Sequence, residues 1–135
     1  MPSELRAFLD GLDVLVIAAP LTRATRGLIG EAELSWLRRG ALLVNVGRAE
    51  IVKEAAMLEA LRNGQLGGAA LDVFESEPLA ADSPLWQMPN VIVSPHCADS
   101  TPESPQRSFD IFLDNLHRFR RGEPLLNIVD REEGY

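Results

Sequence analysis

The chain has 135 residues with 13 basic and 20 acidic side chains, so its formal net charge is −7. This negative field repels phosphate backbones and anionic lipid, which makes nucleic acid and membrane surfaces poor expected partners. A composition of 46% hydrophobic and 24% charged residues is that of an ordinary globular domain, not of a disordered chain. The longest apolar runs fall far short of the roughly 20 residues that cross a bilayer. With one cysteine, no internal disulfide can form, and because the start does not resemble a secretion signal we expect a cytoplasmic protein.

Short apolar, β-branched runs alternate with helical patterns along the chain. This alternation predicts an α/β fold in which parallel strands are joined by crossover helices. The strands are expected at residues 14–19, 42–46, 69–74 and 91–94. Each run is apolar on both faces, which predicts helices on both sides of the sheet.

Start and stop signals predict four helices. They are a short helix from Ser3, a second between Gly30 and Gly40 with arginines in its last turn, a third over residues 51–63, and a fourth from Thr101 or Ser104 to Gly122. The last helix carries an apolar stripe that indicates a core or an interface, formed by Phe109, Phe112, Leu113, Leu116 and Phe119.

Several charged or titratable residues lie at or just beyond the ends of the predicted strands. Parallel strands bring such residues to one edge of the sheet, where open α/β proteins bind ligands. These residues are Arg48, Asp72, Glu75, Glu77 and His96. One arginine, one or two carboxylates and one histidine at that edge would form an acid/base site with an anion clamp. A carboxylate beside the imidazole would raise its pKa and hold one tautomer.

Each of these residues also has a purely structural interpretation. His96 could be a structural histidine bonded to a neighbouring carbonyl, and Arg48 could be a solvated arginine at a strand end. Asp72 lies within an apolar run, and since a buried carboxylate needs a partner, a functional role is favoured for it. For Glu75 the preferred interpretation is loop solvation.

The remaining nucleophilic and metal-binding residue types give weaker signals. Cys97 is adjacent to His96, but neighbours on an extended segment point to opposite faces, so a Cys–His nucleophile is disfavoured. His117 is the only other histidine and lies on a polar helix face. With no histidine pair at ligand spacing, no metal site is expected.

Five segments, in order through nearly the whole chain, resemble the NAD(P)-dependent D-isomer-specific 2-hydroxyacid dehydrogenases, which include glyoxylate/hydroxypyruvate reductases and phosphoglycerate dehydrogenases. The segments are DVLVIAAPLTRATRGLIG, LRRGALLVNVGRAEIV, EALRNGQLGGAALDVFESEPL, SPLWQMPNVIVSPHCADST and GEPLLNIVD. The resemblance implies that residues 1–100 form the C-terminal half of a Rossmann-like, doubly wound NAD(P)-binding domain. Residues 101–135 would be a C-terminal helix and tail that pack toward a substrate domain.

The resemblance also implies a role for each residue of the sheet edge. His96 would exchange a proton with the C2 oxygen of a small D-2-hydroxy acid or 2-keto acid, with Glu77 as its carboxylate partner. Arg48 would bind the substrate carboxylate, and Asp72 would hold the nicotinamide carboxamide of NAD or NADP. The other residues implied to line the cofactor are Pro20, Thr25, Val46, Gly47, Ala98 and Asp99, together with Arg48 and His96 themselves.

Two departures from the family pattern modify this expectation. Ala49 follows Arg48 where the family usually has glycine. More important, the chain contains no G-x-G-x-x-G, the loop that binds the pyrophosphate at a helix N-terminus. We therefore expect a truncated enzyme that is inactive alone and that forms a homodimer or otherwise self-associates through exposed sheet and helix faces. The alternatives are an NAD(H)-sensing, corepressor-like regulator and a non-catalytic piece that pairs with a separately encoded first half.

Overall fold

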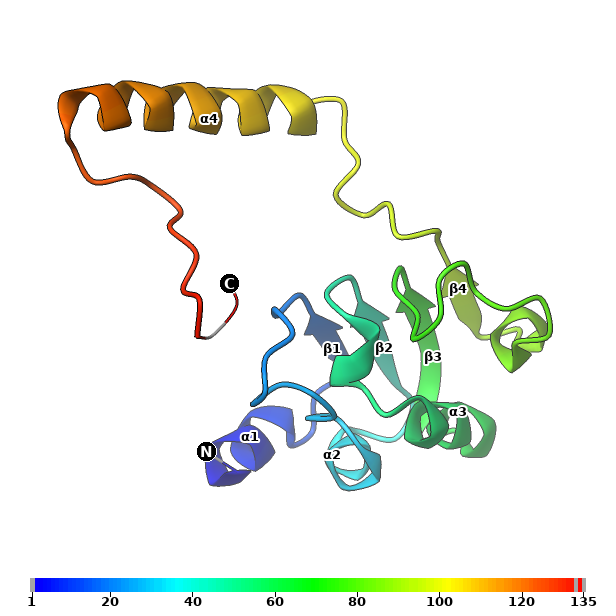
Figure 1. The fold of residues 1–135 in the computed structure, drawn as a ribbon. Coiled ribbons are helices and arrows are strands. Elements are labelled where there is room, and N and C mark those ends of the chain that lie inside the picture. The colour runs from blue at the N-terminus through cyan, green and yellow to red at the C-terminus, as the bar shows by residue number, and fades with distance from the viewer. Residues whose placement is uncertain (1, 133, 135) are drawn as a thin grey trace. The chain divides into compact units, whose positions relative to one another are not determined.

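The computed structural model describes residues 2–132 and residue 134 (Figure 1). The chain divides into two compact units, Met1–His96 and Cys97–Tyr135. Every residue that was predicted to take part in catalysis lies in the first unit. The domain boundary expected at residue 100 remains a prediction.

The first unit contains a sheet of four parallel strands in the order β1-β2-β3-β4. The strands are β1 (Val14–Ile17), β2 (Ala41–Asn45), β3 (Leu66–Leu71) and β4 (Val91–Val93). The helices between and before them are α1 (Pro2–Leu9), α2 (Glu31–Trp36) and α3 (Glu54–Asn63), with short 3-10 turns η1 (Ala49–Ile51) and η2 (Pro84–Gln87). The predicted α/β class with parallel strands is confirmed.

The bounds of β3 differ most from the prediction, which was 69–74. The strand begins three residues earlier because Gly67 and Gly68 let other backbone segments approach closely. A Cβ at Gly67 would clash with the carbonyl oxygen of Gly40. It ends at Leu71, so Asp72 is the first residue after the strand. The register shift beside Ala41 falls at the same place.

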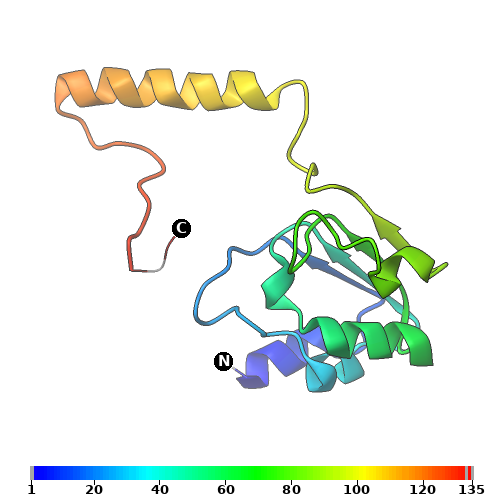
Figure 2. The ribbon, with the colours of Figure 1, turned by 45° about the vertical axis from the view of Figure 1, so that its right-hand side comes forward.

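The three helices of the first unit cover only one face of the sheet (Figures 1 and 2). Alternate residues of β1 and β2 on that face are buried, such as Leu15 and Leu43. On the opposite face Val16 is 59% and Ile92 73% exposed. The prediction of helices on both faces is therefore wrong for this unit, because apolar residues on both faces of a strand show only that both faces need cover, not that the same unit supplies it.

Helix α2 ends at Trp36, so the arginines expected in its last turn lie beyond it. Arg38 instead pairs with Asp13 through Nη1 and Oδ1 at 2.8 Å, and Arg39 donates to the carbonyl of Asn63. The end of α2 is stabilised by Gln65, whose Nε2 donates to the carbonyls of Leu34 and Leu37. A side chain from a distant segment thus donates to the free carbonyls at the helix end, where the sequence had predicted a role for charged arginines.

The second unit contains α4 (Ser104–Arg121), which begins at the second of the two predicted starts. Gly122 ends the helix in the left-handed conformation, with φ 68°. None of its residues is buried, and Phe109, Phe112, Leu116 and Phe119 of the predicted stripe are exposed. Within residues 2–132, no helix combines the length and apolarity needed to span a membrane.

Candidate active site

His96 and Glu77 form a hydrogen-bonded pair beyond the carboxyl end of β4. The Nδ1 of His96 lies 2.8 Å from Oε2 of Glu77, and the other carboxylate oxygen accepts the backbone N–H of Phe74 at 3.0 Å. His96 has φ 50°, in the left-handed region that favours glycine. Non-glycine residues in that region are frequent at functional sites, where the surrounding contacts hold the strained backbone.

The two groups shift each other's pKa in opposite directions. The hydrogen bond and charge of Glu77 raise the pKa of His96, while the imidazole and the Phe74 N–H lower the pKa of Glu77. The positive charge of Arg48 lowers both pKa values by a smaller amount. The three side chains predicted to carry catalysis are therefore close enough to interact electrostatically.

Arg48 follows β2 at the end of a tightly fixed turn. Its side chain is exposed, and its Nη1 donates to the carbonyl of Gly47 at 2.8 Å. A Cβ on Gly47 would lie 2.9 Å from the carbonyl oxygen of Ala19, so only glycine lets this turn lie against the segment after β1. The turn presents a guanidinium at the same sheet edge as His96, where it could bind a carboxylate.

Asp72 is 4% exposed and lies next to the end of β3. Its Oδ1 accepts the hydroxyl of Ser94 at 2.6 Å, which satisfies part of the need of a buried carboxylate. Ser94 itself is anchored to the sheet by its N–H, which donates to the carbonyl of Leu71. A carboxylate held at this edge could accept the amide N–H of a nicotinamide.

The remaining residues predicted to line a cofactor fall into two groups. Thr25 fixes the loop after β1, since its hydroxyl donates to the carbonyl of Pro20 at 2.8 Å, and Val46 continues the ladder by donating its N–H to Ile17. Ala98 and Asp99 belong to the second unit, where the backbone carbonyl of Asp99 accepts a hydrogen bond from the hydroxyl of Ser104 at the start of α4. Their contacts with a cofactor remain predictions.

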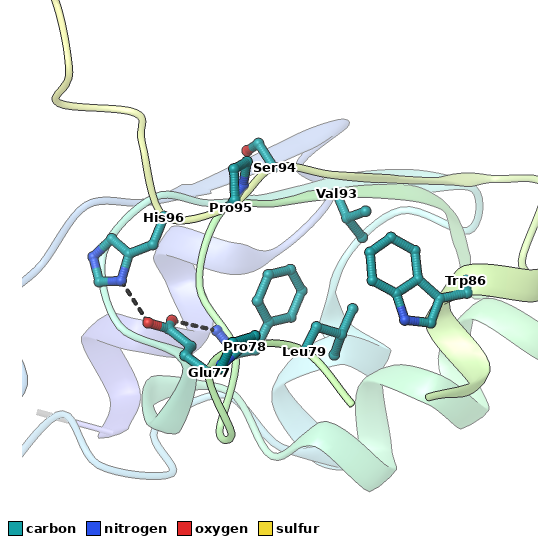
Figure 3. A pocket seen from close by; sticks show the side chains of 9 residues that line it. Glu77, Pro78, Leu79, Trp86, Val93, Ser94, Pro95 and His96 are labelled. Carbon is teal, nitrogen blue, oxygen red and sulfur yellow. Dashed lines mark hydrogen bonds and ion pairs between the residues drawn. The ribbon is translucent and has the colours of Figure 1, made fainter. Parts of the chain in front are cut away.

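A cavity of about 650 Å³ adjoins the His96–Glu77 pair. Figure 3 shows this pair at one end and Trp86 and Val93 at the other, with the second ring nitrogen of His96 pointing away from Glu77. The cavity walls are mostly apolar and are formed by Phe74, Glu77, Pro78, Leu79, Trp86, Val93, Ser94, Pro95 and His96. Since Nε2 points away from this space, the cavity lies behind the acid/base pair.

Two polar residues of the site, Asn45 and Ser94, were missed by the sequence reasoning. Asn45 is 2% exposed and lies at the end of an apolar strand. The signal that singled out Asp72, a polar side chain in an apolar run, applies equally to Asn45 and would have found it. Ser94 could not be found that way, because a serine at a strand end is an ordinary surface residue.

The fold and the site together define a class of protein, the Rossmann-like dehydrogenase domain. The carboxyl edge of its parallel sheet carries a guanidinium, a buried carboxylate and a carboxylate–imidazole pair. Residues 1–98 match the family described as "D-isomer specific 2-hydroxyacid dehydrogenase, NAD binding domain". The chain belongs to this family, as the resemblance of its motifs indicated.

Curated relatives agree with this assignment. A glyoxylate reductase of Aeropyrum pernix is 46% identical over 120 residues, which are 89% of this chain and 36% of the relative. A glyoxylate/hydroxypyruvate reductase A of Salmonella heidelberg is 42% identical over 98% of this chain and 42% of its own length. The chain thus spans less than half the length of these relatives.

Solved structures share the fold at similar identity. A D-isomer specific 2-hydroxyacid dehydrogenase of Xanthobacter autotrophicus Py2, in complex with NADPH and MES, superposes with a TM-score of 0.91 at 45% identity, covering 98% of this chain and 54% of that one. An NADPH-dependent glyoxylate/hydroxypyruvate reductase of Sinorhizobium meliloti, in complex with NADP and sulfate, gives 0.90 at 41% identity and covers 98% and 43%. The predicted half of a Rossmann-like sheet is therefore confirmed.

Proposed function

We propose that the chain carries the catalytic half of an NAD(P)-dependent oxidoreductase that interconverts a small D-2-hydroxy acid and its 2-keto acid. The observation that carries this proposal is the 2.8 Å contact between His96 and Glu77 within electrostatic range of Arg48. A regulator that only senses NAD(H) has no need of an imidazole whose pKa is raised, so the pair favours an enzyme over that alternative.

His96 acts as the general acid and base. Glu77 accepts a hydrogen bond from Nδ1–H, which keeps a proton on that nitrogen and leaves Nε2 to exchange a proton with the substrate oxygen. The raised pKa of His96 keeps more of the imidazole protonated near neutral pH, as reduction of a keto acid requires. In the oxidation direction the neutral imidazole takes the proton back.

Arg48 binds the substrate carboxylate. Its guanidinium is a planar fork that matches a carboxylate with two parallel hydrogen bonds. Before substrate binds, Nη1 donates to the neighbouring Gly47 carbonyl, so binding exchanges that bond for charge-assisted ones. The same positive charge draws electron density from the adjacent carbonyl group of the substrate.

The residues at the sheet edge fit the nicotinamide part of the cofactor. Asp72 is a buried carboxylate held by Ser94, a suitable acceptor for a carboxamide N–H, and Gly47 has no side chain to block a close approach. A bound nicotinamide would supply the hydride. The sequence contains no glycine loop for the pyrophosphate, so we propose that this chain by itself binds NAD or NADP weakly and is inactive.

The proposal is tested on the chain itself by NMR titration with NADPH, NADH and glyoxylate. We expect the nucleotides to shift the amide signals of Val46 and Asp72, and glyoxylate to shift the Arg48 guanidinium signal. Arg48→Met should abolish the glyoxylate response. Arg23→Met is the control: it changes an exposed arginine in the loop after β1 and should retain the response. Absence of a saturable response to either ligand class would refute the assignment, and ordinary turnover of glyoxylate with NADPH would refute the proposed inactivity.

We also propose that the chain self-associates, as a homodimer, through its uncovered apolar sheet face. Val16 and Ile92 lie on one cross-strand row of that face, joined through Val44 and Ala70. Removal of such an exposed apolar row from water by a second surface lowers the free energy.

The single cysteine, Cys97, has an exposed thiol, which fits a reducing compartment. We therefore propose that the chain resides in the cytoplasm.

A further inference from the structure

Asn45 is a polar side chain in the apolar core of the first unit. It is 2% exposed and follows Leu43 on the face of β2 that the helices cover. Its neighbours in register are Ile17 of β1 and Leu71 of β3, both buried. A leucine there would be removed from water at no polar cost, whereas a buried amide is tolerated only if its hydrogen bonds are satisfied.

Both ends of the Asn45 amide bond the same short turn. Oδ1 accepts the N–H of Gly47 at 3.1 Å, and Nδ2 donates to the carbonyl of Arg48 at 3.1 Å. The amide therefore bridges the Gly47–Arg48 dipeptide, from the N–H of Gly47 to the carbonyl of Arg48. Only this orientation of the amide satisfies both groups, because the reverse one would place acceptor against acceptor and donor against donor.

The same turn is held from two further directions. Gly47 packs on the backbone of Ala19, and the carbonyl of Arg48 also accepts the N–H of Ile51 in η1. Beyond the backbone, the Arg48 side chain is exposed, and its Nη1 donates a hydrogen bond to the Gly47 carbonyl within the turn itself. This bond ties the guanidinium to the same turn of backbone that Asn45 fixes.

We propose that Asn45 is a positioning residue, whose buried amide fixes the Gly47–Arg48 turn and so holds the guanidinium where a substrate carboxylate binds. This inference rests on the proposed function of Arg48. It adds that the affinity for 2-keto acids depends on a core side chain that cannot itself touch the substrate. Without the amide, the buried N–H of Gly47 loses its hydrogen-bond acceptor and the turn loses its link to the core.

Three variants separate positioning from a general structural role. Asn45→Leu fills the core without the amide, and Asn45→Ala removes the amide and leaves a cavity. Leu43→Ala is the control: it removes a fully buried side chain two residues earlier on the same strand face and leaves the turn's hydrogen bonds intact. The measurements are the ¹⁵N order parameter of Arg48 Nε, the hydrogen-exchange rate of the Gly47 amide, the affinity for glyoxylate by NMR, and stability in urea.

In the wild-type chain we expect slow exchange of the Gly47 amide. Both Asn45 variants should lower the order of Arg48 Nε, accelerate Gly47 exchange and weaken glyoxylate binding by about tenfold, the effect of one lost hydrogen bond. Leu43→Ala should lower stability in urea more than Asn45→Leu does, yet leave Arg48 order and glyoxylate affinity unchanged.

Fast Gly47 exchange in the wild-type chain would overturn the proposal, even if neither Asn45 variant folds. Unchanged Arg48 order in the Asn45 variants would overturn it too, as would an equal loss of order in Leu43→Ala. The order and exchange measurements need no ligand. If glyoxylate fails to bind the wild-type chain, the proposed function fails, while these two measurements still decide whether Asn45 holds the turn.

Discussion

Glu77 lies 19 positions before His96 in the chain, and its Oε2 lies 2.8 Å from the imidazole Nδ1. Its second oxygen accepts the N–H of Phe74, so a backbone group orients the carboxylate that orients the ring. Since a carboxylate can only accept here, the proton lies on Nδ1 and Nε2 is the nitrogen available to a substrate. The pair sets both the tautomer and the charge of the proposed general acid.

Replacing Glu77 by glutamine should lower the pKa of His96. The substitution keeps a hydrogen-bonding side chain but removes the negative charge that favours the imidazolium. The pKa is measured by NMR titration of the His96 ring protons. The matched control is Glu75→Gln, which changes a neighbouring exposed glutamate with no direct contact to His96 among the described interactions. This variant should leave the pKa of His96 unchanged. Equal effects of both variants would show that the net charge of the loop, not the Glu77–His96 pair, sets the pKa of His96.

The same pair makes stability depend on pH within a defined window. The pKa of His96 is raised above 6.5, so its contribution is fully present below 6.5 and is lost as pH rises through the raised value. The pKa of Glu77 is lowered below 4.5, so its contribution is present above 4.5 and is lost as pH falls through the lowered value.

Urea denaturation of the wild-type chain and of Glu77→Gln should therefore differ most between pH 4.5 and 6.5. The difference should shrink at alkaline pH, where His96 is neutral. Because both side chains are accessible to solvent, the effect is small and is screened by added salt. A difference that grows as pH rises above 6.5 would contradict the raised pKa of His96, and one that grows as pH falls below 4.5 would contradict the lowered pKa of Glu77.

Leu43→Ala should lower the free energy of unfolding by about 2–5 kcal/mol, because the side chain is fully buried under the helices. Leu42→Ala, the adjacent residue on the uncovered face, should cost less than about 1 kcal/mol, since 48% of Leu42 is already exposed. Denaturant unfolding at low protein concentration gives both values. Similar costs would mean that another part of the chain covers the second face.

Gly47→Ala should destabilise the chain by about 1–3 kcal/mol, since its Cβ would lie 2.9 Å from the backbone oxygen of Ala19 and one of the two segments must move. Val46→Ala in the same turn removes part of a side chain that is 40% exposed, and it should cost well under half as much. Thermal unfolding of the two variants compares them directly. A neutral Gly47→Ala would show that the turn can move away from Ala19.

Val16→Lys and Ile92→Lys should shift the chain toward monomer in sedimentation velocity. Each places a charge on the uncovered apolar face, where it would have to be desolvated in a self-associated form. Ser35→Lys adds the same charge on an exposed position of α2 and controls for net charge. Identical sedimentation of all three variants and the wild type would place the association elsewhere or exclude it.

The order and type of the strands and helices were predictable because their signals are local. Apolar runs such as residues 14–17 and 91–93 are the strands, and the periodic pattern of residues 104–121 is a helix that ends at glycine. The helix after residue 51 begins later than its pattern indicated, because Ile51 forms a buried 3-10 turn. Boundaries depend on contacts with distant segments. The end of α2 at Trp36, where the side chain of Gln65 bonds the free carbonyls, illustrates this.

The amino-acid sequence by itself determined the α/β class, the family, and the residues at the sheet edge, because residue type and spacing along one strand or turn carry that information. The tertiary structure decided which carboxylate meets the imidazole: Glu77, Glu75 and Asp72 all lie within a few residues, and only the folded loop brings Glu77 to Nδ1. It also decided that the amide of Asn45 bonds the turn of Arg48 and that the helices of the first unit cover only one face of its sheet. These are relationships between separate segments, which depend on packing in three dimensions and leave no periodic trace in the chain.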